Sequence, residues 1–173
     1  MKTPDPKNKI VSMAQLLAWR AEWRRQGCTV VWTNGCFDVL HVGHVRNLQA
    51  AAGQGDRLVI GVNSDASVRR LKGPTRPVVS QDERAELLAA LACVDAVLIF
   101  EDDTPIPVLA QLQPDVHCKG AEYAPPHGRP IPEAETVRGY GGKIHFIPLI
   151  PNRSTTELIR KMGSGGVGKV TDQ

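Results

Sequence analysis

Two histidines three residues apart carry the strongest chemical signal in the chain. Residues 33–44 read Thr-Asn-Gly-Cys-Phe-Asp-Val-Leu-His-Val-Gly-His and follow a short apolar run. If a helix begins here, His41 and His44 share one face of its first turn, and Gly43 adds no side chain that would obstruct a ligand. A helix N-terminus carries about half a positive charge and N–H groups without helical partners. The pattern therefore favours a polyphosphate site over the simpler interpretation, in which both histidines are surface or capping residues.

Three other polar clusters follow apolar, strand-like segments. Residues 72–77 hold Lys72 and Arg76 in a loop fixed by two prolines, which either closes over phosphates or is a solvated loop. Lys119 ends another apolar run, so we expect its side chain to point into a cleft. Three hydroxyls at residues 154–156 begin an expected helix, where they cap it and also form an anion site.

Other patterns are weaker. The glycines at positions 163, 165 and 168 match the dinucleotide fingerprint, but no strand precedes them, so a flexible tail is the better interpretation. His41 and His44 supply only two metal ligands, with no third at useful spacing, so no protein metal site is expected. The four cysteines form no C-x-x-C pair and fit neither a zinc site nor a disulfide framework.

Apolar runs alternate with helical patterns five times along the chain. Ser12 with Gln15, and Ser80 with Glu83, form capping-box pairs that mark two helix starts. The expected strands are residues 29–33, 57–62, 96–100, 116–119 and 143–149. The expected helices begin near residues 12, 44, 80, 105, 133 and 154, and residues 63–79 form a loop with room for one short helix.

Short, continuously apolar strands indicate that helices cover both faces of the sheet. Right-handed crossovers then predict an α/β fold, a Rossmann-like doubly wound parallel sheet of about five strands in a single domain. We place this domain at residues 11–162, between an N-terminal arm (1–10) and a Gly-rich tail (163–173). Ligands of such sheets bind at the carboxyl ends of the strands, where the polar clusters fall.

Composition and charge limit the classes of ligand and the cellular location that we expect for this protein. The chain has 173 residues and a formal charge of +3, too mild to predict nucleic-acid binding but suited to a small anionic substrate. The longest apolar stretches are strand-sized, so we expect no membrane span. The N-terminus lacks the apolar core of a signal peptide, and we therefore expect a cytoplasmic protein.

With these residues assembled, the chain resembles the H-x-G-H (cytidylyltransferase-like) nucleotidyltransferases, and more narrowly the heptose-1-phosphate adenylyltransferase (ADP-heptose synthase) family. The resemblance covers about residues 11–162. Besides residues 33–44, it rests on Leu-Lys-Gly-Pro-Thr-Arg-Pro at 71–77, Lys-Gly at 119–120 and Ser-Thr-Thr at 154–156. It implies transfer of an adenylyl group from ATP to a sugar 1-phosphate, D-glycero-D-manno-heptose 1-phosphate, in ADP-heptose biosynthesis.

The resemblance also implies roles for individual residues. The catalytic group comprises His41, His44, Lys72 and Lys119. The nucleotide-binding group comprises Thr33, Asn34, Gly35, Cys36, Phe37, His41, Gly43, His44, Gly120, Ser154, Thr155 and Thr156. The substrate-binding group comprises Asp38, Asn63, Lys72, Arg76 and Arg84. A capping role for Asp38 and a surface ion pair for Arg84 are the alternatives, and Mg²⁺ is expected to be held mainly through the ATP phosphates.

The sequence departs from the family pattern after Lys119. Ala121 and Glu122 replace the Gly-Asp of the usual Lys-Gly-Gly-Asp-Tyr, and residues 124–132 are rich in proline. These changes bear on sugar specificity more than on adenylyl transfer. The kinase domain that some family members carry upstream is expected to be a separate sugar kinase here, and a homodimer is possible, as in many relatives. Transfer from CTP to an acceptor such as glycerol 3-phosphate, and a non-catalytic nucleotide-binding module, remain the alternatives.

Overall fold

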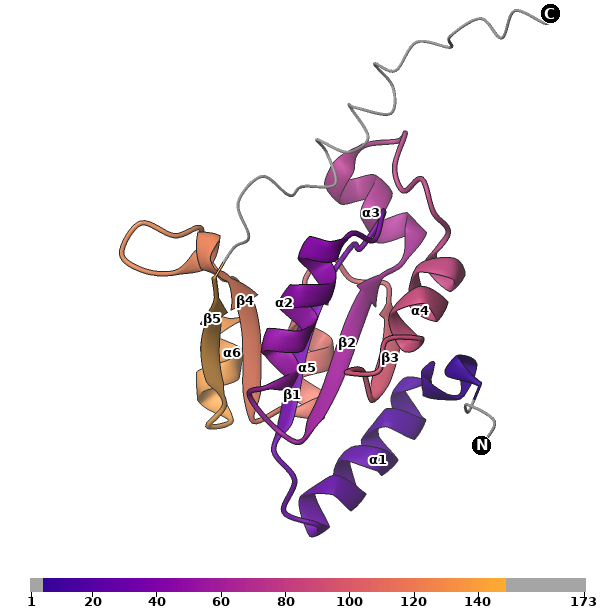
Figure 1. Ribbon diagram of the computed structural model, residues 1–173. Coiled ribbons are helices and arrows are strands. Elements are labelled where there is room, and N and C mark those ends of the chain that lie inside the picture. The colour runs from indigo at the N-terminus through magenta and orange to yellow at the C-terminus, as the bar shows by residue number, and fades with distance from the viewer. Residues whose placement is uncertain (1–4, 149–173) are drawn as a thin grey trace, which may run out of the picture.

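Five parallel strands form one sheet in the order β3-β2-β1-β4-β5 (Figure 1). The computed structural model describes residues 5–148 of the 173-residue chain. The strands are β1 (Val30–Gly35), β2 (Arg57–Asn63), β3 (Ala96–Phe100), β4 (Val116–Gly120) and β5 (Lys143–Ile147). The predicted Rossmann-like doubly wound sheet is confirmed, and each predicted strand lies within a few residues of its position.

Helices cover both faces of the sheet, as the apolar strands require. Helices α1 (Met13–Arg25), α5 (Ile106–Leu112) and α6 (Ala134–Gly139) pack on one face, and α2 (Val42–Ala52) and α4 (Gln81–Ala89) pack on the other. Figure 1 shows α2 in front of the sheet and α5 and α6 behind it. A two-turn helix, α3 (Asp65–Lys72), occupies part of the predicted loop, and η1 (Pro6–Lys9) and η2 (Ala121–Tyr123) are single 3₁₀ turns. The predicted helix from residue 154 lies outside the described residues.

Local sequence signals explain two helix starts. Ser12 and Gln15 form the predicted capping box of α1, and Ser80 and Glu83 form that of α4, so both pairs satisfy N–H groups that have no helical partner. Gly27 follows the end of α1 with a φ of 72°, a conformation that side chains disfavour.

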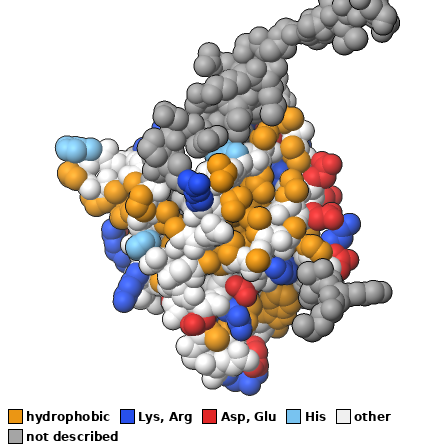
Figure 2. All heavy atoms as spheres, in the orientation of Figure 1, with side chains coloured by type: hydrophobic (Ala, Val, Ile, Leu, Met, Phe, Trp, Pro, Cys, Tyr) orange, Lys and Arg blue, Asp and Glu red, His pale blue; other side chains and the backbone are white. Residues whose placement is uncertain are grey.

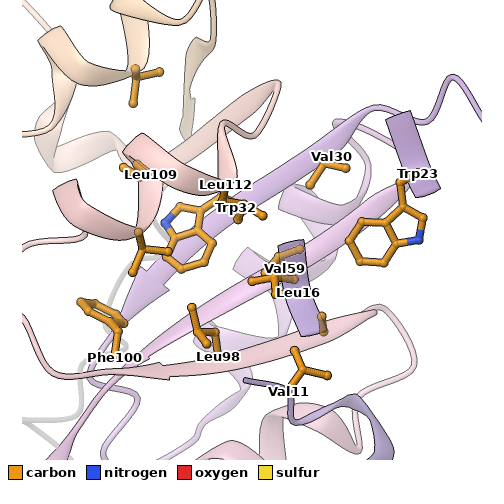
Figure 3. Close-up of a cluster of buried hydrophobic side chains, with 13 residues drawn as sticks. Val11, Leu16, Trp23, Val30, Trp32, Val59, Leu98, Phe100, Leu109 and Leu112 are labelled. Atoms are coloured by element: carbon orange, nitrogen blue, oxygen red, sulfur yellow. The ribbon is translucent and has the colours of Figure 1, made fainter. Parts of the chain in front are cut away.

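The core on the α1 side is built around Trp32, whose indole is fully buried (Figure 3). Leu109 and Leu112 of α5 lie beside it, and Leu16 and Trp23 of α1 pack along the same face. The Trp32 ring occupies the space where a Cβ at Gly61 of the neighbouring strand would lie, so a glycine is needed there. A second apolar cluster, on the opposite face, joins α2 and α4 to the sheet.

The predicted N-terminal arm is attached to the domain over residues 5–10. Ile10 forms a parallel bridge with Val97 at the edge strand β3, and Lys9 Nζ donates to the Leu91 carbonyl at 3.3 Å. These contacts cover part of an otherwise open strand edge. Within residues 5–148, every helix is too short or too polar to span a bilayer.

Candidate functional site

A pocket lies where the strand order reverses, at the carboxyl ends of β1 and β4. The strand register pairs Gly35 with Val62 and Gly120 with Ile147, so the strands end at a common edge. The pocket measures about 820 Å³, enough for a nucleotide and a second small substrate. Its lining contains most of the predicted site residues: Thr33, Asn34, Gly35, Cys36, Phe37, Asp38, His41, Gly43, His44, Asn63, Lys72, Arg76, Lys119 and Gly120.

The molecular surface distributes charge unevenly around this region. On the face drawn in Figure 2, acidic side chains gather along the right-hand edge. Hydrophobic, histidine and basic side chains lie around the upper centre of that face, toward the end of the sheet where the strands finish.

Both histidines are held by the first turn of α2. His41 is its N-cap residue, and its Nδ1 accepts a hydrogen bond from the Gly43 N–H at 3.1 Å. His44 Nδ1 in turn accepts from the His41 N–H at 3.4 Å, and the two rings stack with centroids 3.9 Å apart. Since Nδ1 accepts in each ring, the ring proton is on Nε2. Capping and phosphate binding are therefore compatible, because they use different nitrogens.

His44 is a neutral donor at neutral pH. Burial, with a smaller contribution from neighbouring His41, lowers the pKa of His44 to about 4. The Phe37 ring meets His44 edge-on at 5.5 Å between centroids and contributes to that burial. His44 therefore adds no positive charge to the pocket at neutral pH, whereas the lysine and arginine side chains and the N-terminus of α2 do.

The turn after β1 brings the predicted nucleotide-binding residues to the pocket wall. The Thr33 hydroxyl donates to the Cys118 carbonyl at 3.2 Å, which ties β1 to β4 directly below the pocket. Asn34 Oδ1 is buried and accepts no hydrogen bond within residues 5–148. Cys36 also lines the pocket, and burial raises the pKa of its thiol, so it is a neutral wall residue.

The Asp38 carboxylate binds other groups of the protein. Its carboxylate accepts from the Val78 N–H at 2.6 Å and the Val79 N–H at 3.1 Å, and it pairs with the Arg76 guanidinium. Burial acts to raise the pKa of Asp38, but these donors outweigh it and leave the pKa below its ordinary value. The structure thus shows Asp38 holding residues 76–79, and its contact with sugar or metal stays a prediction.

Arg84, like Asp38, binds other parts of the protein. Its side chain is fully buried and lies beneath the pocket rather than in its lining. The guanidinium donates to the carbonyls of Val79 at 3.0 Å and Asn63 at 2.9 Å, to the Cys36 carbonyl, and to the Asp65 carboxylate at 2.7 Å. Its ion pair is buried rather than at the surface, and it joins three segments of the pocket wall from inside; its contact with substrate stays a prediction.

Two cations and an amide remain on the β2 side of the pocket. Lys72, at the end of α3, takes part in no ion pair within the part of the chain that is described, so its charge is uncompensated there. Arg76 lines the pocket but shares its charge with Asp38. Asn63 Nδ2 donates to the Ser67 hydroxyl at 3.0 Å, which fixes the amide at the pocket edge.

On the β4 side, Lys119 points toward the pocket as predicted, but its charge has a partner. Its ammonium lies 2.7 Å from Oε1 of Glu133, a carboxylate that is 1% exposed, and 4.8 Å from the centre of the Tyr123 ring. The same oxygen lies 3.0 Å from Nε2 of His117, a buried residue of β4. The sequence analysis identified neither Glu133 nor His117, since nothing in the local pattern places them together.

The predicted phosphate-binding hydroxyls of Ser154, Thr155 and Thr156 lie outside the described residues. Within residues 5–148, no group of three or more His, Cys, Asp or Glu side chains is placed to hold a metal ion.

Residues 32–161 match the family model described as cytidylyltransferase-like. Among curated relatives, the chain is 52% identical over 139 residues to the Bifunctional protein HldE of Syntrophotalea carbinolica, which covers 80% of this chain and 28% of that protein. It is 48% identical over 157 residues to the Bifunctional protein HldE of Methylobacillus flagellatus, with 91% and 32% covered. The chain thus spans about a third of the length of these relatives.

Two solved structures share the fold. The lipopolysaccharide core biosynthesis protein of Thermoplasma volcanium has 26% sequence identity and a TM-score of 0.56, with 72% of this chain and 98% of that chain covered. The pantoate-β-alanine ligase of Francisella tularensis, solved with β,γ ATP and β-alanine, has 14% identity and a TM-score of 0.58, with 85% and 68% covered. At that identity, the second likeness shows the fold alone.

Proposed function

Since this chain belongs to the cytidylyltransferase-like family, we propose that its pocket joins ATP to a sugar 1-phosphate, giving an ADP-sugar and pyrophosphate. The sugar phosphate we assign is D-glycero-D-manno-heptose 1-phosphate. This choice is supported by the resemblance of residues 33–44 and 71–77 to the heptose-1-phosphate adenylyltransferases and by the identity to the two HldE proteins.

One observation carries the proposal: two imidazoles with protonated Nε2 atoms stack at a helix N-terminus inside a pocket that also contains Lys72 and Lys119. In the reaction, a phosphate oxygen of the sugar 1-phosphate bonds to the α-phosphorus of ATP. The bond from that phosphorus to the α,β-bridging oxygen breaks, and pyrophosphate leaves. Because the attacking oxygen is already ionised at neutral pH, the site needs alignment and charge stabilisation rather than a general base.

The pocket offers these contributions from different walls. His41 and His44 would donate to the α- and β-phosphates through Nε2, and the N-terminus of α2 adds its partial positive charge. Lys72, with its uncompensated charge, would neutralise the incoming sugar phosphate or the α-phosphate. We assign the β- and γ-phosphates to Ser154 and Thr155 on the basis of the family resemblance.

We assign Mg²⁺ to the phosphates of ATP. The buried pocket carboxylates are already engaged, Asp38 by Arg76 and two backbone N–H groups and Glu133 by Lys119 and His117, so phosphate oxygens are the better hard ligands. When bound, the ion supplies charge to the leaving pyrophosphate. Chelation should abolish turnover, and excess Mg²⁺ should restore it.

The competing function is transfer from CTP to another phosphorylated acceptor such as glycerol 3-phosphate. Pyrophosphate release should be measured with ATP and CTP against heptose 1-phosphate and glycerol 3-phosphate, each nucleotide at subsaturating concentration. We expect kcat/KM with heptose 1-phosphate to favour ATP by at least about tenfold, which requires about 1.4 kcal/mol of differential transition-state binding. A preference for CTP would overturn the adenylyl assignment, and no release with any pair would overturn the enzyme assignment.

Three further assignments accompany this function. The sugar 1-phosphate would be supplied by a sugar kinase activity, and we assign the reaction to the cytoplasm, where ATP is available. We also propose a homodimer, which light scattering would detect as twice the 18.8 kDa of the chain.

A further inference from the structure

We propose that Glu133 is a positioning residue for Lys119, and that it fixes the lysine ammonium at the wall of the pocket where the nucleotide phosphates arrive. Buried His117 holds the carboxylate in place from the other side. This inference deepens the proposed function and rests on it, because it assigns to Lys119 a contact with the reacting phosphates.

The first step is the geometry of a shared oxygen. Glu133 Oε1 lies 2.7 Å from Lys119 Nζ and 3.0 Å from His117 Nε2. Glu133 precedes the first residue of α6, whereas the other two residues belong to β4, so the contact joins the helix start to the strand. The Glu133 and His117 side chains are 1% and 0% exposed, but that of Lys119 is 12% exposed and reaches the pocket.

The second step is the charge of each member. Burial acts to raise the pKa of Glu133, but the hydrogen bonds from His117 and Lys119 outweigh it and lower the pKa to about 2. Burial lowers the pKa of His117, which is therefore neutral at pH 7. An ionised carboxylate only accepts hydrogen bonds, so His117 donates its Nε2 proton to Glu133. The arrangement contains one negative and one positive charge.

The third step is why this pair exists. Removing two charges from water is costly, and a buried ion pair is often no more stabilising than apolar side chains of similar size. A contribution to folding stability therefore does not by itself explain why Glu133 and Lys119 form a pair at this position. A lysine also has a flexible four-carbon stem, whose ammonium occupies many positions unless partners hold it.

The fourth step is how Lys119 is held. The carboxylate binds the ammonium on one side, and the Tyr123 ring lies 4.8 Å away on another. An ammonium has three donors, so the bond to Glu133 leaves others for a ligand in the pocket. Preorganised donors stabilise developing charge without reorganisation during the reaction. Glu133 balances the lysine charge in the ground state, so its removal should impair turnover more than ATP binding.

The test is Glu133→Gln, which keeps the size of the side chain and one acceptor oxygen but removes the charge. We expect kcat for pyrophosphate release to fall at least about tenfold while KM for ATP does not rise, because misplacement of a reacting group acts mainly on turnover. Glu133→Asp should recover part of the loss. Glu135→Gln, an exposed carboxylate of the same helix, is the matched control and should behave as wild type.

A double-mutant cycle separates positioning from folding. If Glu133 acts through Lys119, Glu133→Gln should add no further loss of kcat in a Lys119→Met background. Additive losses, or a loss that follows the unfolding temperature of each variant, would overturn the proposal.

A second readout does not depend on turnover. Acetic anhydride reacts with neutral amines, and mass spectrometry can compare acetylation of Lys119 with that of Lys72, which has no ion-pair partner within residues 5–148. We expect the Lys119/Lys72 rate ratio to rise severalfold in Glu133→Gln, and an unchanged ratio would overturn the proposal. Absence of pyrophosphate release by the wild type, with the ratio changed as expected, would instead overturn the proposed function.

Discussion

Each side of the pocket contains a buried carboxylate paired with a cation, but the two carboxylates hold different parts of the protein in place. On the side of β1 and β2, the oxygens of Asp38 bind two backbone N–H groups as well as Arg76. On the side of β4, the partners of Glu133 from other residues of the described chain are two side chains, His117 and Lys119. The first carboxylate fixes a segment of backbone, and the second fixes the end of one flexible side chain.

This difference predicts whether a substitution changes mainly the free energy of unfolding or mainly turnover. Arg84 lies on the same side as Asp38, and each of its three guanidinium nitrogens donates to a protein group beneath the pocket. Substitutions on the Asp38 side should therefore lower mainly the free energy of unfolding. Substitutions on the Glu133 side should lower mainly kcat.

The largest effect on stability is expected for Arg84→Met. The substitution leaves three carbonyl oxygens and the partly exposed Asp65 carboxylate without their donor, and each buried acceptor left unsatisfied costs about 1–3 kcal/mol. Urea unfolding followed by circular dichroism should show this loss. Arg46→Met, an exposed arginine on α2, is the control and should change the unfolding free energy by less than about 0.5 kcal/mol. A similar small change for Arg84→Met would contradict the role of Arg84 as a joint between wall segments.

A smaller effect is expected for Asp38→Asn. Hydrogen bonds to charged groups contribute about 1.5–3 kcal/mol, and the amide retains only part of that set. Since the folded pKa of Asp38 lies below its ordinary value of 3.8, the stabilisation is present above that pH and is lost as the pH falls through the folded pKa. Urea unfolding of both proteins at pH 7 and pH 3 measures this. A difference that does not shrink at pH 3 would exclude the ionised carboxylate as its cause.

The sequence predicted those parts of the site that local rules govern. Residues 33–44 combine a strand end, a helix start and two histidines within one short segment, so their proximity requires no knowledge of the fold. Glu133 and His117 are 16 positions apart and meet only because α6 begins beside β4. Asp38 and Arg84 were identified as important, but their roles could not be predicted, because burial and the direction of each donor depend on how the loops pack.

The smallest effect concerns the pH dependence of stability. His44 has a folded pKa of about 4 against 6.5 for an ordinary histidine, so between these values the unfolded chain binds a proton that the folded chain does not. The unfolding free energy therefore falls as the pH drops from 6.5 toward 4. Relative to His44→Gln, wild type should lose about 1 kcal/mol between pH 7 and pH 5.5 in urea unfolding. Parallel profiles for the two proteins would contradict a buried, neutral His44.

The central claim is that the stacked histidines stabilise the transition state of adenylyl transfer, beyond their role as helix caps. Asn is a strong N-cap residue, so His41→Asn preserves the side-chain cap while removing the Nε2 donor, and His44→Ala removes the second donor together with only the longer capping contact, the 3.4 Å bond from the His41 N–H. The most direct measurement is kcat for pyrophosphate release from ATP and heptose 1-phosphate, with urea unfolding in parallel. The account predicts a fall of roughly 10²–10³ in kcat for each variant, with the unfolding free energy within about 1 kcal/mol of wild type. Near-normal turnover in a stable variant would contradict it and return the two histidines to a capping role.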